Sequence, residues 1–217
     1  PDLLIIQGQN ESLARFCREH KIRFLSIEIN TLEDIWAAIH TIGQTLRAEE
    51  NASALIQKIK DDLQDIKGRI HNLPPKKVFL TLGHTPGDLT GLMTTGPGTF
   101  LHELVSVAGG ENIFSDATGL YPQISKESLV KRQPEVIIEA LPGGIPEEKL
   151  KLLEKDWLQF PMLPAVQSAC SAPEPDGQRC RERSHQGSGI PGLPAVRRLP
   201  HPACWSRWWK GSGRLPS

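Results

Sequence analysis

The chain has 217 residues, a mass of 24.0 kDa and equal numbers of basic and acidic residues, 25 of each, and 38% of its residues are hydrophobic. Its longest apolar runs fall far short of the roughly 18–20 residues that a membrane-spanning helix needs, which argues against a transmembrane protein. The neutral balance also argues against a nucleic-acid-binding protein, because phosphate binding needs a surplus of Lys and Arg on one face.

The N-terminal residues alternate between strand and helix patterns. Leu3–Ile6 is a continuous apolar run typical of a buried strand, and Ile22–Ile27 is predicted to be the next strand. Between these two runs, Asn10 can cap a helix. Two strands separated by one helix predict a β-α-β unit, in which the strands are parallel.

Two helices are predicted next. Thr31 stands three residues before Asp34, a weak capping arrangement, and apolar residues then recur at helical spacing as far as Leu46. A longer amphipathic helix is predicted from Glu49 to His71, about 33 Å long at the rise of an α-helix, and it ends at two prolines. Because no heptad repeat continues beyond it, we interpret this helix as an intramolecular strut in preference to a coiled coil.

A second alternating block follows the prolines. Its predicted elements are a strand at Lys77–Leu82, a Gly- and Pro-rich loop at Gly83–Gly98, a helix at Thr99–Ala108, a short segment at Asn112–Phe114, a helix capped by Ser125, a strand at Glu135–Leu141 and a helix at Pro146–Lys155. Open parallel sheets bind ligands at the carboxyl ends of their strands, so we expect the loops there to face a common cleft. These loops are Gln7–Asn10, Gly83–Thr95, Gly119–Tyr121 and Pro142–Gly144.

The residues after Val166 have a different composition. Residues 167–217 hold eight Lys and Arg against three Asp and Glu, a charge of +5, so the first 166 residues carry −5. This segment has almost no aliphatic periodicity, and with little apolar area to offset its ordering entropy we interpret it as a disordered or frame-shifted tail. An ordinary disordered extension, lipid or RNA binding, and metal binding are the alternatives, although its Cys and His spacing matches no compact ligand set.

The chain opens directly on the first predicted strand, without an initiator Met and without a signal-peptide pattern. We therefore expect either a processed or cloned start, or a first lobe whose beginning is missing.

The middle of the chain resembles a known family. The run Gly109-Gly110-Glu111-Asn112-Ile113-Phe114, followed by Tyr121-Pro122-Gln123-Ile124-Ser125-Lys126-Glu127, is similar to the periplasmic substrate-binding proteins of ABC importers that carry cobalamin, haem or iron-siderophores. The resemblance covers about Pro1 to Gln167. It implies an α/β fold with two Rossmann-like lobes bridged by a long helix, with the first lobe largely missing and the last strands of the second replaced by the basic tail.

On this interpretation the chain has five parts. They are a remnant of the first lobe (1–29), the last helix of that lobe (30–48), the bridging helix (49–72), the second lobe (73–166) and the tail (167–217).

The resemblance also implies roles for individual residues. Tyr121 matches an aromatic residue that lies against the ligand, and an aromatic face suits a flat macrocycle or a catecholate. Gln7 stands where a cobalamin-binding member has a tryptophan, which weakens a cobalamin-specific wall. Glu127 matches an acidic residue that docks onto arginines of the permease. The alternatives are a loop aromatic packed beneath Pro122 for Tyr121, and a charge that favours the helix dipole for Glu127.

The loop at Gly83–Gly96 matches neither a P-loop nor a dinucleotide-binding motif. His84 with Asp88 could form an acid–base or metal pair, but one histidine without a further ligand is more typical of polar lining. We therefore expect His84, Met93 and Thr94 to form cleft walls. No nucleophile with an adjacent base can be assembled, so neither an enzyme, nor a cofactor, nor a metal site is predicted.

The sequence thus predicts an extracytoplasmic solute-binding protein, or a fragment of one, that acts as a monomer. It would capture a corrinoid, haem or iron-siderophore, a small-molecule metal chelate, and deliver it to an ABC transporter permease by lobe closure. The resemblance implies a periplasmic location or an extracellular one with a membrane anchor. A non-functional gene fragment and a Rossmann-like enzyme remain the alternatives.

Overall fold

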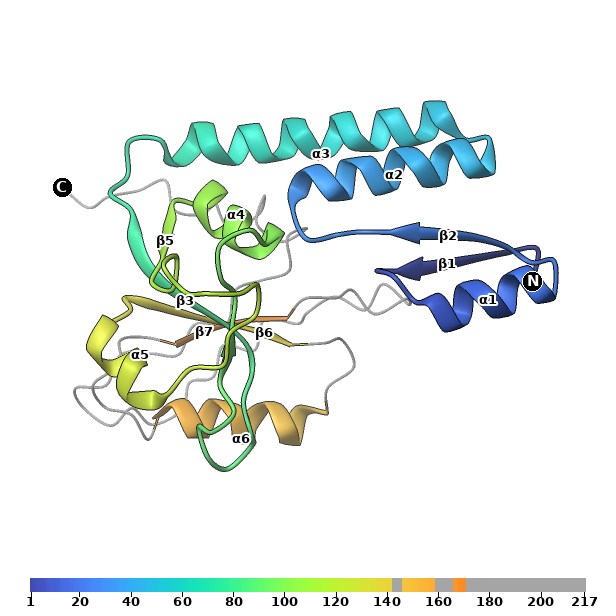
Figure 1. Cartoon of the computed structure of the whole chain (residues 1–217). Coiled ribbons are helices and arrows are strands. Elements are labelled where there is room, and N and C mark those ends of the chain that lie inside the picture. Colours follow the sequence, from blue (N-terminus) through green and yellow to red (C-terminus); the bar gives the residue numbers. More distant parts are fainter. Residues whose placement is uncertain (142–145, 159–165, 171–217) are drawn as a thin grey trace. The chain divides into compact units, whose positions relative to one another are not determined.

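The computed structural model describes residues 1–141, 146–158 and 166–170. The chain forms two compact units, which are treated separately below (Figure 1). The first consists of Pro1–Pro74 and Gly98–Gly109, and the second of Pro75–Pro97 and the chain from Gly110 onward. The predicted disorder from residue 171 onward and the predicted cleft loop Pro142–Gly144 lie outside the described residues.

The first unit begins with the predicted β-α-β arrangement. Strands β1 (Leu3–Gln7) and β2 (Arg23–Ile27) pair in parallel, with Leu3 opposite Arg23. Helix α1 (Glu11–Glu19) connects them, and it begins where the Asn10 side chain accepts a hydrogen bond of 3.0 Å from the Leu13 N–H. The predicted cap and the predicted strand direction are both confirmed.

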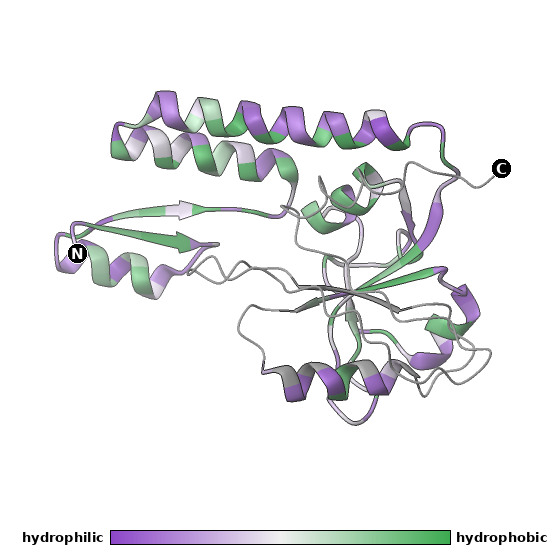
Figure 2. Ribbon diagram, turned by 180° about the vertical axis from the view of Figure 1, so that it is seen from behind, coloured by the Kyte–Doolittle hydropathy of each residue, from purple (hydrophilic) through white to green (hydrophobic). Residues whose placement is uncertain are grey.

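Helices α2 (Leu32–Leu46) and α3 (Glu49–Ile70) follow and pack against each other (Figure 1). The arrangement of Thr31 and Asp34 is a complete capping box, because the Thr31 hydroxyl accepts from the Asp34 N–H and the Asp34 carboxylate accepts from the Thr31 N–H. Hydrophilic and hydrophobic residues alternate along α3, as expected of an amphipathic helix (Figure 2).

Helix α4 (Phe100–Val107) belongs to the first unit, although the sequence placed it with the second block. Two long-range hydrogen bonds hold it there. The Phe100 N–H donates to the Asn30 carbonyl at 2.5 Å, and the Glu103 carboxylate accepts from the Leu32 N–H at 2.8 Å. Glu103 therefore supplies an acceptor and a negative charge at the N-terminus of α2, which leaves that helix start satisfied.

The second unit contains a mixed sheet in the order β4-β3-β6-β7, with β5 also beside β3. Its strands are β3 (Lys76–Gly83), β4 (Met93–Thr94), β5 (Gly110–Asn112), β6 (Val136–Leu141) and β7 (Val166–Cys170). All pairings are parallel except that of β4, which runs antiparallel to the carboxyl end of β3. The predicted loop after β3 therefore contains a short strand.

Strand β7 extends the second unit beyond the predicted boundary at Val166. It pairs with β6 from Ile137 opposite Val166 to Leu141 opposite Cys170, so residues 167–170 belong to the sheet and not to a tail. Helix α6 (Glu147–Leu158) lies between these two strands in the sequence, as a parallel pair requires. The observed strand ends later than the predicted boundary because residues 167–170 join the sheet through backbone pairing with β6. No side-chain pattern reveals such pairing.

The core of the second unit is apolar and partly aromatic. Phe79 on β3 makes edge-type contacts with Phe114 and Trp157, with interplanar angles of 63° and 67° and ring centroids 5.8 and 6.1 Å away. Helix α5 (Lys126–Arg132) adds Leu129 to this cluster and begins at Ser125, whose hydroxyl accepts from the Ser128 N–H as predicted. This packing holds the loops that follow β3 in place.

Candidate functional site

Two segments of the second unit form an antiparallel ladder at the carboxyl end of β3. Residues 92–96, which include β4, run beside residues 120–124, and Met93 bridges Gln123. The hydrogen bonds are Ile124 N–H to Leu92 O (2.9 Å), Thr94 N–H to Pro122 O (3.0 Å) and Gly96 N–H to Leu120 O (2.8 Å). This register places Thr95 opposite Tyr121.

The ladder brings two predicted ligand contacts to one side. Side chains that are opposite or two residues apart on such a ladder share a face, so Met93 and Tyr121 are diagonal neighbours on a face that also carries Thr95, which is buried, and Gln123, which is exposed. Both are exposed, Met93 at 43% and Tyr121 at 40%. Because Met93 is opposite Gly83, the last residue of β3, this face lies where open α/β sheets bind ligands.

Thr94, the third residue expected on this wall, is buried. Its hydroxyl donates a 2.6 Å hydrogen bond to the Leu80 carbonyl of β3, and its side chain has no exposed surface. This bond directs the Thr94 side chain toward β3. The expectation that Thr94 lines a cleft is therefore wrong for this structure, in which Thr94 attaches β4 to β3.

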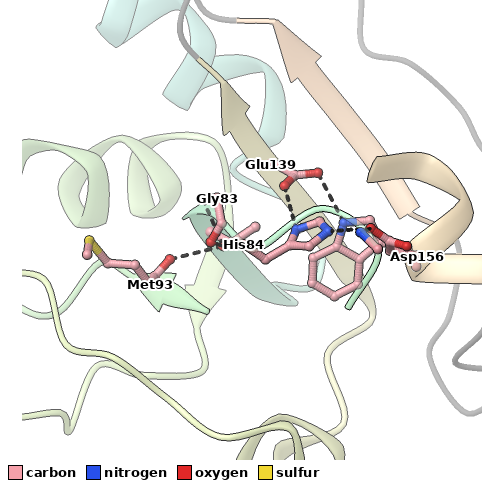
Figure 3. Close-up of polar contacts among 8 residues, drawn as sticks. Gly83, His84, Met93, Glu139 and Asp156 are labelled. Atoms are coloured by element: carbon pink, nitrogen blue, oxygen red, sulfur yellow. Dashed lines mark hydrogen bonds and ion pairs between the residues drawn. The ribbon is translucent and has the colours of Figure 1, made fainter. Parts of the chain in front are cut away.

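His84 is also buried, and it lies between two carboxylates (Figure 3). Its Nδ1 is 2.9 Å from Glu139 Oε1 on β6, and its Nε2 is 3.2 Å from Asp156 Oδ2 on α6. The exposed fractions of the three side chains are 0%, 1% and 2%. With no exposed surface, the His84 side chain cannot line a cleft here, so the sequence-based expectation is corrected.

The electrostatics of His84 follow from this surrounding. Burial lowers the pKa of the imidazole, but the adjacent Glu139 and Asp156 carboxylates together outweigh it and raise the pKa above its ordinary value. The pair of His84 with Asp88, which the sequence left open as the less favoured alternative, is not the contact that forms: His84 faces Glu139 and Asp156, and Asp88 makes an ion pair with Lys126. Glu139 was overlooked, although a single acid within the apolar strand Val136–Leu141 is a signal of a buried polar contact.

The other two predicted site residues are exposed and lie in different units. Gln7 ends β1 in the first unit, and Glu127 lies in the first turn of α5 in the second. The backbone N–H of Glu127 and the hydroxyl of Ser125 hold the pKa of the Glu127 carboxyl below its ordinary value, as is typical of a first-turn acid. A common cleft and a docking role both remain predictions.

No group of three or more His, Cys, Asp or Glu side chains in the described residues could hold a metal ion. None of the helices in the described part of the chain is both long and apolar enough to cross a membrane.

An α/β sheet with an exposed apolar face at its strand ends is typical of proteins that bind a small ligand. Residues 1–167 match the model of the periplasmic binding protein family, and the chain belongs to this family. The predicted resemblance is thereby confirmed. The family consists of binding proteins and not of enzymes, so the alternative of a Rossmann-like enzyme is excluded.

Known relatives agree with this assignment. The chain is 29% identical over 169 residues to a vitamin B12-binding protein of Salmonella typhi, and the match covers 76% of this chain and 60% of the relative. Among solved structures, it is similar to an ABC transporter substrate-binding protein from Listeria monocytogenes EGD-e, with 20% identity, a TM-score of 0.62 and coverage of 75% and 61%. A periplasmic haem-binding protein from Pseudomonas aeruginosa is similar with 20% identity, a TM-score of 0.60 and coverage of 71% and 56%. The chain spans about 60% of the length of the curated relative.

Proposed function

We propose that this chain is part of an extracytoplasmic solute-binding protein that captures a corrinoid, haem or iron-siderophore for an ABC importer. The observation that carries the proposal is the exposed face of Met93 and Tyr121 at the carboxyl end of β3. A thioether and an aromatic ring offer polarisable, flat contact area, which suits a macrocycle or an aromatic chelate. The names of the relatives, a vitamin B12-binding protein and a haem-binding protein, support the same chemical class.

The partner in this proposal is the permease of the importer, and Glu127 is the docking residue. It lies on α5, whereas Met93 and Tyr121 lie on the ladder, so one unit presents separate residues to ligand and partner. The location proposed is the periplasm or the outer face of the cell membrane, which the name of the periplasmic haem-binding relative supports.

The proposal is tested by titrating the purified chain with hemin, cyanocobalamin and a ferric hydroxamate, using calorimetry. Tyr121→Ala and Met93→Ala should each weaken binding of the preferred ligand by about 1–3 kcal/mol, because each removes apolar area from the contact. Leu152→Ala is the matched control, since Leu152 is 40% exposed on α6. Equal affinity of all three variants and the unsubstituted chain would remove the ladder from the binding site.

A further inference from the structure

Three buried side chains meet inside the second unit from separate elements. His84 directly follows β3, Glu139 belongs to β6 and Asp156 to α6, and we refer to these three residues as the His84 cluster (Figure 3). A binding face at the protein surface does not require such a cluster. Buried ionisable groups are costly unless they are mutually compensated, so the cluster needs a physical account of its own.

The donors and acceptors of the cluster can be counted. Glu139 Oε2 accepts from the Trp157 indole N–H at 3.1 Å, and Asp156 Oδ2 accepts from the Gly87 N–H at 2.7 Å. Each ring nitrogen of His84 also faces a carboxylate oxygen. A neutral imidazole has one donor and one acceptor, so it would direct a lone pair at one of those oxygens.

Favourable contacts at both ring nitrogens therefore need two protons between the ring and the carboxylates. Either His84 is an imidazolium between two carboxylates, or the ring is neutral and one carboxyl group is protonated. The contact between His84 Nδ1 and Glu139 Oε1 is the weaker of the two, since neither atom has a hydrogen bond of good geometry. Removing one proton leaves two acceptors in contact, which is unfavourable for side chains that are at most 2% exposed.

The cluster also holds a loop. Gly87 lies in the segment 84–91, and its N–H is bonded to the same Asp156 oxygen that faces His84 Nε2. This segment leads directly to Met93 on the ladder. Among the described residues, Glu139 on β6 and Asp156 on α6 are the charged groups that face the ring, while Asp88 on the same loop is exposed and paired with Lys126.

We propose that the His84 cluster is a proton-dependent latch. It holds loop 84–91 on α6 while each ring nitrogen of His84 either donates a proton to a hydrogen bond or accepts one from a carboxyl group. It releases this loop when one of the two protons is lost. The raised pKa of His84 sets the direction: the latch is closed at low pH and opens as the pH rises through that value. For each unit by which the pKa of His84 in the closed state exceeds its pKa in the open state, the equilibrium at high pH shifts about tenfold toward the open state.

Amide hydrogen exchange of the full chain, measured from about pH 5 to about pH 9, tests the latch. After correction for the intrinsic pH dependence of exchange, the protection of residues 84–91 should fall as the pH rises. The His84 ring, followed by NMR with labelled histidine and assigned with His84→Gln, should titrate at the same midpoint. Protection that does not depend on pH, or a ring that keeps one protonation state throughout, would overturn the proposal.

Glu139→Gln is the decisive variant. Its amide oxygen can accept from the Trp157 indole and its amide nitrogen can donate to a neutral His84 Nδ1, so the cluster no longer needs the second proton. Loop 84–91 should then remain protected at every pH. Glu135→Gln is the control, because Glu135 is an exposed acid paired with Lys76 and its replacement should leave the pH dependence unchanged. An unaltered pH dependence in Glu139→Gln would contradict the latch.

One consequence rests on the proposed function: opening of the loop that precedes Met93 should lower affinity for a metal chelate at high pH. The exchange measurement needs no ligand, so the two proposals can fail separately. Normal latch behaviour without binding of hemin, cyanocobalamin or ferric hydroxamate would contradict only the proposed function. Binding with pH-independent protection of the loop would contradict only the latch.

Discussion

Gly96 lies directly against the carbonyl oxygen of Gly119. A Cβ atom at position 96 would come closer than 3.0 Å to that oxygen, a distance that real Cβ atoms essentially never show. The neighbouring atom is backbone, so it cannot rotate away as a flexible side chain would. The ladder that presents Met93 and Tyr121 therefore depends on the absence of a side chain at position 96.

Replacing Gly96 with Ala should separate the two segments of the ladder. We expect a loss of about 1–3 kcal/mol in the free energy of unfolding, measured by urea denaturation, because the clash forces the backbone to move. Gly68→Ala makes the same chemical change within α3, where a Cβ would meet no atom within 4 Å. It should stabilise the chain by up to about 1 kcal/mol, since alanine favours a helix. Equal effects of the two substitutions would refute the close approach.

A second close approach joins α2 and α3. A Cβ at Gly43 would collide with the Cβ of Ala52, so Gly43→Ala should push the two helices apart and lower the midpoint of thermal unfolding. Adding Ala52→Gly restores the space. The double variant should recover part of the loss, although glycine within α3 costs about 1 kcal/mol in helix propensity. Purely additive effects in this double-mutant cycle would show that the two positions do not touch.

The buried hydroxyl of Thr94 should contribute measurably to stability. Thr94→Val keeps the shape of the side chain but leaves the Leu80 carbonyl without this donor, which should cost about 1–3 kcal/mol in urea unfolding. Thr90→Val is the control at an exposed position and should change stability by no more than about 0.5 kcal/mol. A Thr94→Val variant as stable as the unsubstituted chain would mean that the ladder does not need this bond.

Stability should depend on pH in two opposite ways. The raised pKa of His84 contributes stability that is present below the ordinary histidine pKa and is lost as the pH rises through the folded value. The pKa of Asp116 is lowered by its bond to Arg132, and that of Glu135 by its bond to Lys76, so their contributions are lost as the pH falls. Urea unfolding across the pH range should show a maximum. The alkaline decline should disappear in His84→Gln, and its persistence there would assign it to another group.

Glu127→Lys tests the proposed docking role. Because the residue is exposed in the first turn of α5 and is not part of the ladder, the variant should bind ligand normally but deliver it poorly to the permease in a transport assay. Glu148→Lys reverses another exposed acid, near the start of α6, and should transport normally. Normal transport by Glu127→Lys would leave this residue only its favourable position at the helix N-terminus.

Most elements of the fold could be predicted because their signals are local. At Asn10, Thr31 and Ser125, a helix begins where a side-chain oxygen accepts a hydrogen bond from the backbone N–H three residues ahead. Such a contact can be predicted from the residue type and its position before a helical pattern. The first strand of the first unit was recognisable from a continuous apolar run, and the second from a run that is mostly apolar. A role for Tyr121 in ligand binding was predicted from the resemblance to substrate-binding proteins. The ladder places Tyr121 beside Met93, and both side chains are exposed.

The roles of His84 and Thr94 were decided by tertiary structure. The partner of His84 on α6 is 72 residues away in the chain, and the Leu80 carbonyl bound by Thr94 belongs to a neighbouring strand. Neither spacing nor composition records such a pairing, because only the packing of β3, β6 and α6 brings these atoms together. The sequence by itself therefore determined which segments become helices and strands, whereas burial and long-range hydrogen bonding decided which polar residues stay available to a ligand.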